Sequence, residues 1–289
     1  MPTKIEKELN RGKPTTGHEW DGIEELDTPL PKWWLYVLYA CIAWSLVYFV
    51  LYPSWPGLSG YYKGLLGWDS RTEVAARIDE AKRAQSRYLD RIRMLSTDDI
   101  TKDPDLLSFA LAGGRAAFAD NCVPCHAAGG AGRTGFPSLA DDLWIWGGKL
   151  ADIEKTIRFG IRSGHDSARA GLMPNFGADG VLKGPQIDDV AEYILAFTGR
   201  SKDKAAADRG AKVFADNCVA CHGEKGTGNP ELGAPPLNTR IWLYGGAKAD
   251  IVGQVTKPQH GMMPAWAGRL DDDTIKMLTL YVHSLGGGK

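Results

Sequence analysis

The sequence predicts a mainly α-helical protein in which one N-terminal transmembrane helix precedes two tandem copies of a small helical domain. Two observations predict this fold. Residues 33–52 form a stretch of twenty residues without a charge near the N-terminus. Farther along the chain, the segment 114–122 (GRAAFADNC) returns 96 positions later as 210–218 (GAKVFADNC). Such self-similarity at a fixed offset indicates a duplicated module.

Residues 1–32 are expected to form a short polar tail, and residues 33–52 the membrane span. A helix rising about 1.5 Å per residue crosses a hydrocarbon core of about 30 Å with this length. Aromatic side chains, which favour membrane interfaces, stand at both ends: Trp33, Trp34, Tyr52 and Trp55. The alternatives are a buried core helix and a cleaved signal peptide. The long tail and the lack of an A-x-A-like cleavage site disfavour a signal peptide.

One face of the span contains Cys41 and Ser45, a pair of small residues that lets another helix approach closely. Ser45 is also the only strongly polar side chain in the core of the span. We therefore predict that this face packs on a partner subunit. The alternative is that the Ser45 hydroxyl is satisfied by its own helix backbone. Cys41 is expected in lipid as a small apolar residue, not as half of a disulfide.

The remaining chain divides into three parts. Residues 53–102 are predicted to be a juxtamembrane segment and a connecting helix, which a Ser70-Arg71-Thr72-Glu73 capping box opens and which runs to about Leu95. The two repeated domains are expected at 103–199 and 200–286, with a polar linker at their junction. Each domain is predicted to begin with a helix and to end with an amphipathic one, at 187–197 and 274–285. Acidic residues that could cap these last helices precede or open them: Asp188, Asp189, Asp271, Asp272 and Asp273.

Each repeat contains a C-x-x-C-H motif, the attachment signature of c-type haem. The first motif is Cys122–His126 and the second is Cys218–His222. Two thiols at this spacing reach the two vinyl groups of one porphyrin, and the histidine then becomes the proximal iron ligand. A zinc ribbon needs its Cys pairs much closer together, and a thioredoxin-like site expects a βαβ setting. The motifs therefore predict two tandem cytochrome c-type domains, with two covalent haem c groups bound through Cys122, Cys125, Cys218 and Cys221 and ligated by His126 and His222.

A Met-Pro pair follows each motif and predicts the second axial ligand. The pairs are Met173-Pro174 and Met263-Pro264. A thioether opposite a histidine is typical of electron-carrying cytochromes c and raises the reduction potential. Met262 competes with Met263 but lacks the proline. His165 and His260 stay open as nitrogen ligands.

Further residues repeat between motif and methionine. Pro137-Ser138-Leu139 loosely matches Pro236-Leu237, and both are expected to line the proximal side. The Trp144-Ile145-Trp146-Gly147-Gly148 segment matches Trp242-Leu243-Tyr244-Gly245-Gly246. These aromatic side chains are equally compatible with donating hydrogen bonds to haem propionates and with ordinary packing.

Composition and charge set further limits. The 289 residues are 44% hydrophobic with a formal net charge of -1, and no basic run suggests nucleic-acid binding. Positive residues near the two ends of the span balance, so they leave its orientation open. Covalent haem c is attached on the periplasmic side of the bacterial inner membrane. We therefore expect a cytoplasmic N-terminus and periplasmic haem domains.

The segments flanking the span carry a family resemblance. Residues 20–34 (WDGIEELDTPLPKWW) resemble the entry to the membrane helix in subunit III of cbb3-type cytochrome c oxidases, and residues 62–68 (YKGLLGW) resemble its periplasmic juxtamembrane segment. Thr28 stands where that family commonly has Asn. The resemblance covers nearly the whole chain and is looser over Ser163–Leu172.

The resemblance implies a role in respiratory electron transport. In this family a membrane-anchored dihaem subunit takes electrons from a donor cytochrome c or the bc1 complex, and they pass through a monohaem subunit to a catalytic haem–copper subunit. That subunit reduces oxygen to water while protons cross the membrane. The resemblance pairs Met173 with the first motif and Met263 with the second, and implies no bond chemistry in the subunit itself. Two alternatives stay open: a dihaem peroxidase-like enzyme, and an anchored shuttle without an oxidase partner.

Overall fold

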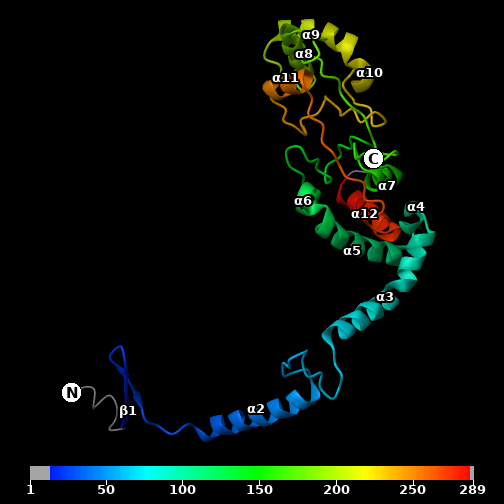
Figure 1. Ribbon diagram of the computed structural model, residues 1–289. Coiled ribbons are helices and arrows are strands. Elements are labelled where there is room, and N and C mark those ends of the chain that lie inside the picture. The colour runs from blue at the N-terminus through cyan, green and yellow to red at the C-terminus, as the bar shows by residue number, and fades with distance from the viewer. Residues whose placement is uncertain (1–13, 287–289) are drawn as a thin grey trace. The chain divides into compact units, whose positions relative to one another are not determined.

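The computed structural model describes residues 14–286 and has two compact units, Met1–Ala84 and Gln85–Lys289 (Figure 1). Helices dominate both units, which confirms the predicted mainly α fold class. Each unit is taken by itself below.

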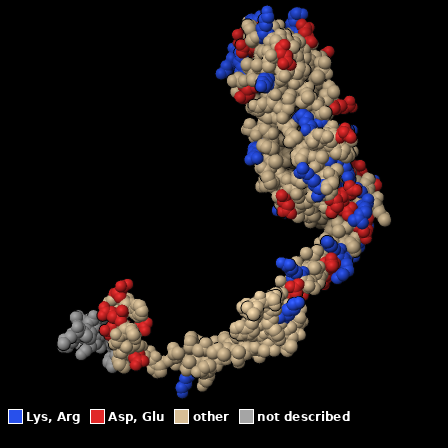
Figure 2. All heavy atoms as spheres, viewed as in Figure 1, with Lys and Arg blue, Asp and Glu red and all other residues tan. Residues whose placement is uncertain are grey.

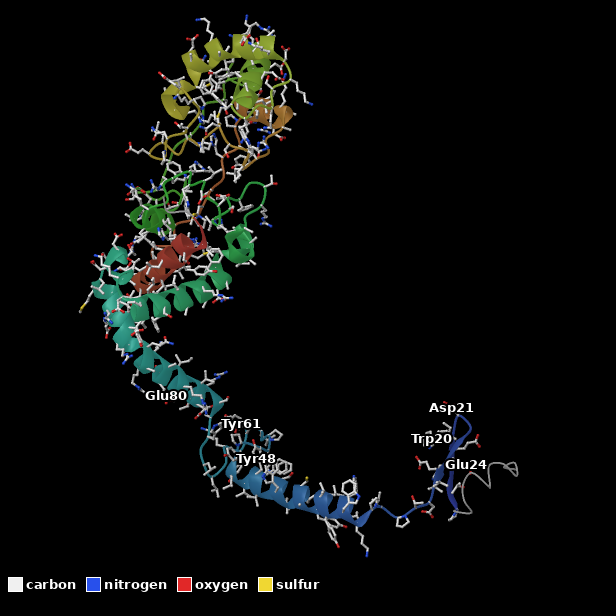
Figure 3. The ribbon with its side chains drawn as sticks, turned by 180° about the vertical axis from the view of Figure 1, so that it is seen from behind. Trp20, Asp21, Glu24, Tyr48, Tyr61 and Glu80 are labelled. Atoms are coloured by element: carbon white, nitrogen blue, oxygen red, sulfur yellow. The ribbon has the colours of Figure 1, made fainter. Side chains whose placement is uncertain are left out.

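The first unit begins with a β-hairpin where the sequence predicts only a polar tail. Strand β1 (Thr15–Trp20) pairs antiparallel with β2 (Ile23–Leu26), and Figure 3 labels Trp20, Asp21 and Glu24 on it. The two turn residues have positive φ, 53° at Asp21 and 86° at Gly22. A two-residue Asp-Gly loop of this kind favours hairpins because its twist matches that of the strands. That dipeptide is the sequence signal for the hairpin. Most of the rest of the tail, residues 1–13, lies outside the described residues.

Helix α2 (Lys32–Leu51) agrees closely with the predicted span and has no buried residue. Within residues 14–286 it is the one helix long and apolar enough to cross a membrane, and Figure 2 shows it as an almost uncharged stretch. The Ser45 hydroxyl donates to the Cys41 carbonyl oxygen at 2.8 Å. The polar group in the core of the span is therefore satisfied by its own backbone, which was the alternative to a partner contact.

The chain folds back on the carboxyl end of α2. The amides of Leu65 and Leu66 donate to the carbonyls of Val50 and Leu51, both at 3.0 Å, and the Ser54 hydroxyl donates to the Phe49 carbonyl at 2.9 Å. These bonds satisfy carbonyls that a helix end otherwise leaves without partners.

Helix α3 (Ser70–Met94) follows, with bounds close to those predicted but a different cap. The Asp69 carboxylate accepts from the Thr72 amide at 2.9 Å and from its hydroxyl at 3.0 Å. The expected capping box at Ser70 and Glu73 is therefore wrong, since Glu73 instead pairs with Arg77 at 2.8 Å. The hydrogen bond from the Thr72 amide is the main reason that the pKa of Asp69 is lowered.

The second unit contains the two repeats. Its elements in chain order are α4 (Thr97–Ile100), α5 (Pro104–Asn121), α6 (Val123–His126), the 3-10 turn η1 (Ala128–Gly130), α7 (Leu150–Phe159), α8 (Gly184–Ala196), α9 (Lys204–Asn217), α10 (Val219–His222), α11 (Lys248–Thr256) and α12 (Asp272–Leu285). The helices predicted before each motif and at each repeat's end are all present.

The terminal helices of the two repeats are exchanged. Helix α8, which ends the first repeat, packs on α9 and α11 of the second, whereas α12 packs on α5 and α7 of the first (Figure 1). Each apolar core is therefore built from both repeats. The expected domains 103–199 and 200–286 follow the sequence repeat, but the packing does not divide at residue 200.

A glycine from the repeated segment allows each exchanged helix to approach closely. A methyl group at Gly114 of α5 would collide with the Met277 carbonyl of α12, and one at Gly210 of α9 would collide with the Asp189 carbonyl of α8. These glycines occupy equivalent positions 96 residues apart. The duplicated sequence thus forms the same helix crossing twice, each time with the other repeat's last helix.

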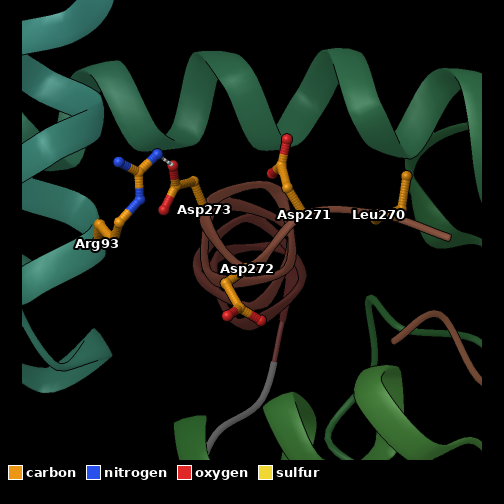
Figure 4. Close-up of a pocket in the computed structure, with 5 residues that line it drawn as sticks. All are labelled: Arg93, Leu270, Asp271, Asp272 and Asp273. Atoms are coloured by element: carbon orange, nitrogen blue, oxygen red, sulfur yellow. Dashed lines mark hydrogen bonds and ion pairs between the residues drawn. The ribbon is translucent and has the colours of Figure 1, made fainter. Parts of the chain in front are cut away.

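Of the acidic residues predicted to cap the last helices, Asp271 does so. The Asp271 carboxylate accepts from the Thr274 amide at 2.7 Å and caps α12. Beside it, Asp273 is buried and accepts from Arg93 at 2.6 Å (Figure 4). The cap expected at α8 is wrong, because Asp189 lies inside the helix and pairs with Arg209 of α9 at 2.6 Å.

Candidate haem-binding pockets

Each motif lies in an apolar cluster, and we call the surroundings of Cys122–His126 the first pocket and those of Cys218–His222 the second pocket. The histidine of each is held in the same way. His126 Nδ1 lies 3.0 Å from the Pro137 carbonyl oxygen, and His222 Nδ1 lies 2.9 Å from that of Pro235. Because a carbonyl only accepts, Nδ1 carries the proton and Nε2 keeps its lone pair. Burial lowers the pKa of both rings. Both histidines are therefore neutral and oriented as metal ligands at neutral pH.

The bonds that close each pocket correct the repeat register. The amides of Leu139 and Leu237 donate to the carbonyls of Gly130 and Gly226 at 2.6 and 2.7 Å. The equivalent of Pro137 is accordingly Pro235, not Pro236 as the loose match implied. The proximal wall is thus Pro-Ser-Leu in one pocket and Pro-Pro-Leu in the other.

Each motif has one sheltered and one exposed cysteine. Cys122 is partly buried and Cys218 buried, whereas Cys125 and Cys221 are exposed. Burial raises the pKa of the Cys122 thiol to about 11 and that of Cys218 to about 11. Thiols of this kind stay protonated, unlike the low-pKa thiolate of a thioredoxin-like pair. The environment therefore suits a thioether bond in an apolar pocket better than disulfide exchange.

The methionines lie in the pockets opposite to those expected. Met263 packs in the first pocket with Cys122, Val123 and Trp144. Met173 packs in the second pocket, in the cluster around Cys218, Val219 and Trp242. The pairing implied by the family resemblance, Met173 with the first motif, therefore differs from the packing. The cause is the helix exchange, because each methionine precedes the terminal helix that crosses to the other repeat.

Met262 and the two histidine alternatives lie in other surroundings. Met262 is 69% exposed, whereas Met263 is partly buried. His165 is exposed, with Nδ1 accepting from the Ser167 amide at 3.0 Å. His260 is exposed as well, and its Nε2 lies 3.2 Å from the Met173 carbonyl oxygen. Of the candidate distal ligands, only Met173 and Met263 pack into the apolar clusters.

Two buried hydrogen-bond donors lack protein partners and test whether a haem fits. The Trp144 Nε1–H in the first pocket and an Arg200 Nη2 group beside Trp242 of the second are buried without a partner. Buried donors of this kind are rare in folded proteins, and haem propionates are acceptors. In contrast, Trp242 Nε1 donates to the Thr239 carbonyl at 3.0 Å. Among the described residues, the buried donor without a partner is thus Trp144 in the first pocket and Arg200 in the second, and no sequence pattern selects Arg200.

The fold and the pockets together define a class of protein. An exposed apolar helix precedes two pockets, each with two cysteines, a neutral histidine and a methionine, and each with an unpaired donor suited to a propionate. This combination is that of a membrane-anchored cytochrome of the c type.

Comparison with known proteins narrows the class to one family. A family model described as the N-terminal domain of cytochrome oxidase-cbb3, FixP, matches residues 12–59, and one for cytochrome c oxidase, cbb3-type, subunit III, matches residues 109–194 and 205–282. The chain belongs to this cbb3-type subunit III family.

Members of the family are similar to this chain over nearly their whole length. The cbb3-type cytochrome c oxidase subunit CcoP of Azospirillum brasilense is 55% identical, covering 98% of this chain and 99% of the relative. Subunit FixP of Azorhizobium caulinodans is 51% identical, covering 96% and 94%. Subunit CcoP of Cereibacter sphaeroides is 46% identical, with complete coverage of both chains.

Proposed function

We propose that this chain is the dihaem c electron-transfer subunit of a cbb3-type terminal oxidase, with axial ligands exchanged between its repeats. One haem c is bound to Cys122 and Cys125, with His126 and Met263 as axial ligands. The other is bound to Cys218 and Cys221, with His222 and Met173. The observation that carries the ligand assignment is the packing of each methionine against the other repeat's motif.

The residues hold each group in place and set its electronic environment. The Nδ1–H bond to a proline carbonyl fixes each imidazole and leaves Nε2 free, so Nε2 would be the atom that binds the iron. A methionine sulfur favours the ferrous state, and the apolar clusters exclude water, so both features support a high potential. When bound, haem c supplies reversible one-electron transfer between ferric and ferrous iron. The Trp144 and Arg200 donors, which are buried without partners, would bond the propionates.

In the proposed route, electrons arrive from a donor cytochrome c or the bc1 complex. They then pass through the monohaem subunit to the haem–copper subunit. Helix α2 anchors the chain in the bacterial inner membrane. We infer that the N-terminus is cytoplasmic and the pockets are periplasmic, since covalent haem c is attached there. The names of the relatives as oxidase subunits support these partners.

The ligand exchange is tested in variants that carry one haem. Cys218→Ala/Cys221→Ala leaves only the first attachment site, and Cys122→Ala/Cys125→Ala leaves only the second. In the first background, Met263→Leu should abolish the long-wavelength absorption band of methionine-ligated ferric haem, while Met173→Leu should retain it. In the second background the two results should be reversed. Met262→Leu is the matched control and should retain the band in both. Loss of the band with the same-repeat methionine would overturn the exchange.

Assembly into an oxidase is tested separately. The intact chain should co-migrate on native gels with a haem–copper subunit, whereas an anchored shuttle would migrate without one. A peroxidase-like enzyme needs an iron with an open or displaceable position, and a methionine in each pocket disfavours it. Rapid peroxide turnover by the purified chain would contradict the proposed function.

A further inference from the structure

The two segments that carry the methionines are hydrogen-bonded to each other. We name them the Met173 loop (residues 171–174) and the Met263 loop (residues 260–264). In the Met263 loop, His260 Nε2 lies 3.2 Å from the carbonyl oxygen of Met173. The helix exchange brings the loops together, because each leaves its own repeat for the opposite pocket.

Arg162 joins both loops with one side chain. Its Nε donates to the Gly261 carbonyl at 2.7 Å, and its Nη1 donates to the Gly171 carbonyl at 2.8 Å. Each acceptor lies two residues before a methionine in the sequence. The planar guanidinium thus holds both loops in a fixed relation, which a single flexible ammonium does less well.

The backbone around Arg162 is itself fixed against the Met263 loop. The amide of Ile161 donates to the Met263 carbonyl and the amide of Met263 donates to the Ile161 carbonyl, both at 3.0 Å. A methyl group at Gly160 would collide with the Met263 carbonyl, so the segment around Gly160 and the Met263 loop are in close contact. Arg162 has φ of 51°, a left-handed conformation that is costly for a residue with a side chain. Such strain persists where surrounding contacts hold it, and it concentrates at functional positions.

The charge of Arg162 has no carboxylate beside it. Within the described part of the chain its hydrogen-bond acceptors are the two carbonyls, and no ion pair involves it. Burial lowers the pKa of the guanidinium, with Tyr244 opposing this shift, but an arginine remains charged at neutral pH. A positive charge therefore lies between the two loops.

From these contacts we propose that Arg162 is a positioning residue for both distal methionines, tying the two haem sites together. This inference rests on the proposed methionine ligation. With the side chain in place, each loop holds its sulfur against the iron, and the positive charge favours ferrous iron at both sites. Loss of the side chain should therefore loosen both Met–Fe bonds at once, although Arg162 belongs to only one repeat.

The experiment uses the full-length chain with both haems and three variants. Arg162→Gln removes both the positive charge and the guanidinium group that bonds the two loops. Arg162→Lys keeps the charge but lacks the two-pronged guanidinium fork. Arg158→Gln is the control, since Arg158 is also a partly buried arginine, which pairs with Glu154 at 2.9 Å and with Asp272, and its side chain bonds neither loop.

Three readouts are compared: the methionine band, the two midpoint potentials, and the affinity of ferric haem for added imidazole, which competes with methionine. Arg162→Gln should weaken the band, lower both potentials and tighten imidazole binding about ten- to hundredfold at both haems, as expected for one lost charge-assisted bond at each loop. Arg162→Lys should restore the part of each potential that depends on the charge, but not the resistance to imidazole. Arg158→Gln should match the parent chain in all three.

The outcomes separate this inference from the ligand assignment. If the parent chain lacks the methionine band, the proposed ligation fails whatever Arg162 does. If the parent chain has the band and Arg162→Gln changes one haem or neither, the role of Arg162 is overturned. Full resistance to imidazole in Arg162→Lys would contradict the guanidinium fork as the cause.

Discussion

The first and second pockets share an inner construction and differ in what surrounds it. Both have the glycine helix crossing, the histidine bonded to a proline carbonyl, and the leucine amide bonded to a glycine carbonyl. The first pocket is backed by an additional apolar cluster that reaches the end of α3 through Ile92 and α4 through Ile100. Helix α8, which packs in the second pocket, instead carries a buried carboxylate, Glu192, which binds the segment joining α8 to α9.

The difference separates the residues that form a pocket from those that connect it to neighbouring segments. The duplicated residues form the pocket, so they recur at a nearly constant offset. The residues that are not duplicated connect each pocket to its own neighbour, α3 in one case and the inter-repeat linker in the other. A substitution in the first group should affect one pocket through its exchanged helix, whereas one in the second group should affect stability without changing the pocket.

The largest expected effect is at the crossing glycines. Gly114→Ala and Gly210→Ala each place a methyl group against the carbonyl of a crossing helix, which should cost about 2–3 kcal/mol of unfolding free energy. Gly114→Ala should disturb the first haem and Gly210→Ala the second, as followed by haem absorbance during denaturation. Gly253→Ala in α11 is the control, because its added methyl meets open space, and it should be neutral or stabilising. Equal damage to both haems from Gly114→Ala would contradict the independence of the two crossings.

The next effect is a pH dependence of stability that comes from Glu192, at the segment joining α8 to α9. The Glu192 carboxylate accepts from the Ser201 hydroxyl at 2.7 Å and the Lys202 amide at 2.9 Å, and it pairs with Lys248 at 3.1 Å. These bonds, that of Ser201 first, lower the pKa of Glu192 to about 2 from its ordinary 4.5.

Because this pKa is lower in the folded state, the stabilisation is present above about pH 4.5 and is lost as the pH falls towards 2. We expect Glu192 to contribute about 2 kcal/mol at pH 7. Glu192→Gln should lower the stability at pH 7 and flatten its decline between pH 5 and 2, measured by urea denaturation. An unchanged acid slope in the variant would show that other carboxyl groups produce it.

A smaller effect is expected where the first pocket is attached to α3. Lys276 of α12 donates to the carbonyls of Ile92, Arg93 and Leu95 at 3.0, 2.9 and 2.7 Å. A cation at a helix carboxyl end satisfies its free carbonyls and interacts favourably with its dipole. Lys276→Met should therefore cost about 1–2 kcal/mol and increase amide exchange at the end of α3. Lys212→Met, which removes an exposed pair with Asp216, is the control and should leave exchange there unchanged.

Much of this architecture can be predicted from the sequence, and the exchange of helices marks the limit. The motifs, the repeat and the apolar span depend on local patterns, so they identify the cysteines, the histidines and the helices. Helices α8 and α12 carry similar amphipathic patterns, and either pattern fits either pocket. The short link between α8 and α9, residues 197–203, was an available signal, since short connections favour antiparallel neighbours. Arg162 and Arg200 gave no signal, because Arg162 acts through backbone carbonyls that the exchange brings together and Arg200 acts through a buried donor without a partner beside Trp242.

The smallest expected effect concerns the membrane helix, where polarity and size can be separated. The Ser45 hydroxyl already bonds the Cys41 carbonyl, so Ser45→Ala removes a bond within the helix itself. We expect Ser45→Ala to leave the co-purified oxidase subunits unchanged. If this face packs on another helix, it does so through the small size of its side chains. Cys41→Phe and Ser45→Leu should then loosen the assembly in detergent, while Leu46→Phe on the opposite face should not. Equal retention of the partner subunits in all three enlarged variants would leave α2 as a lipid anchor only.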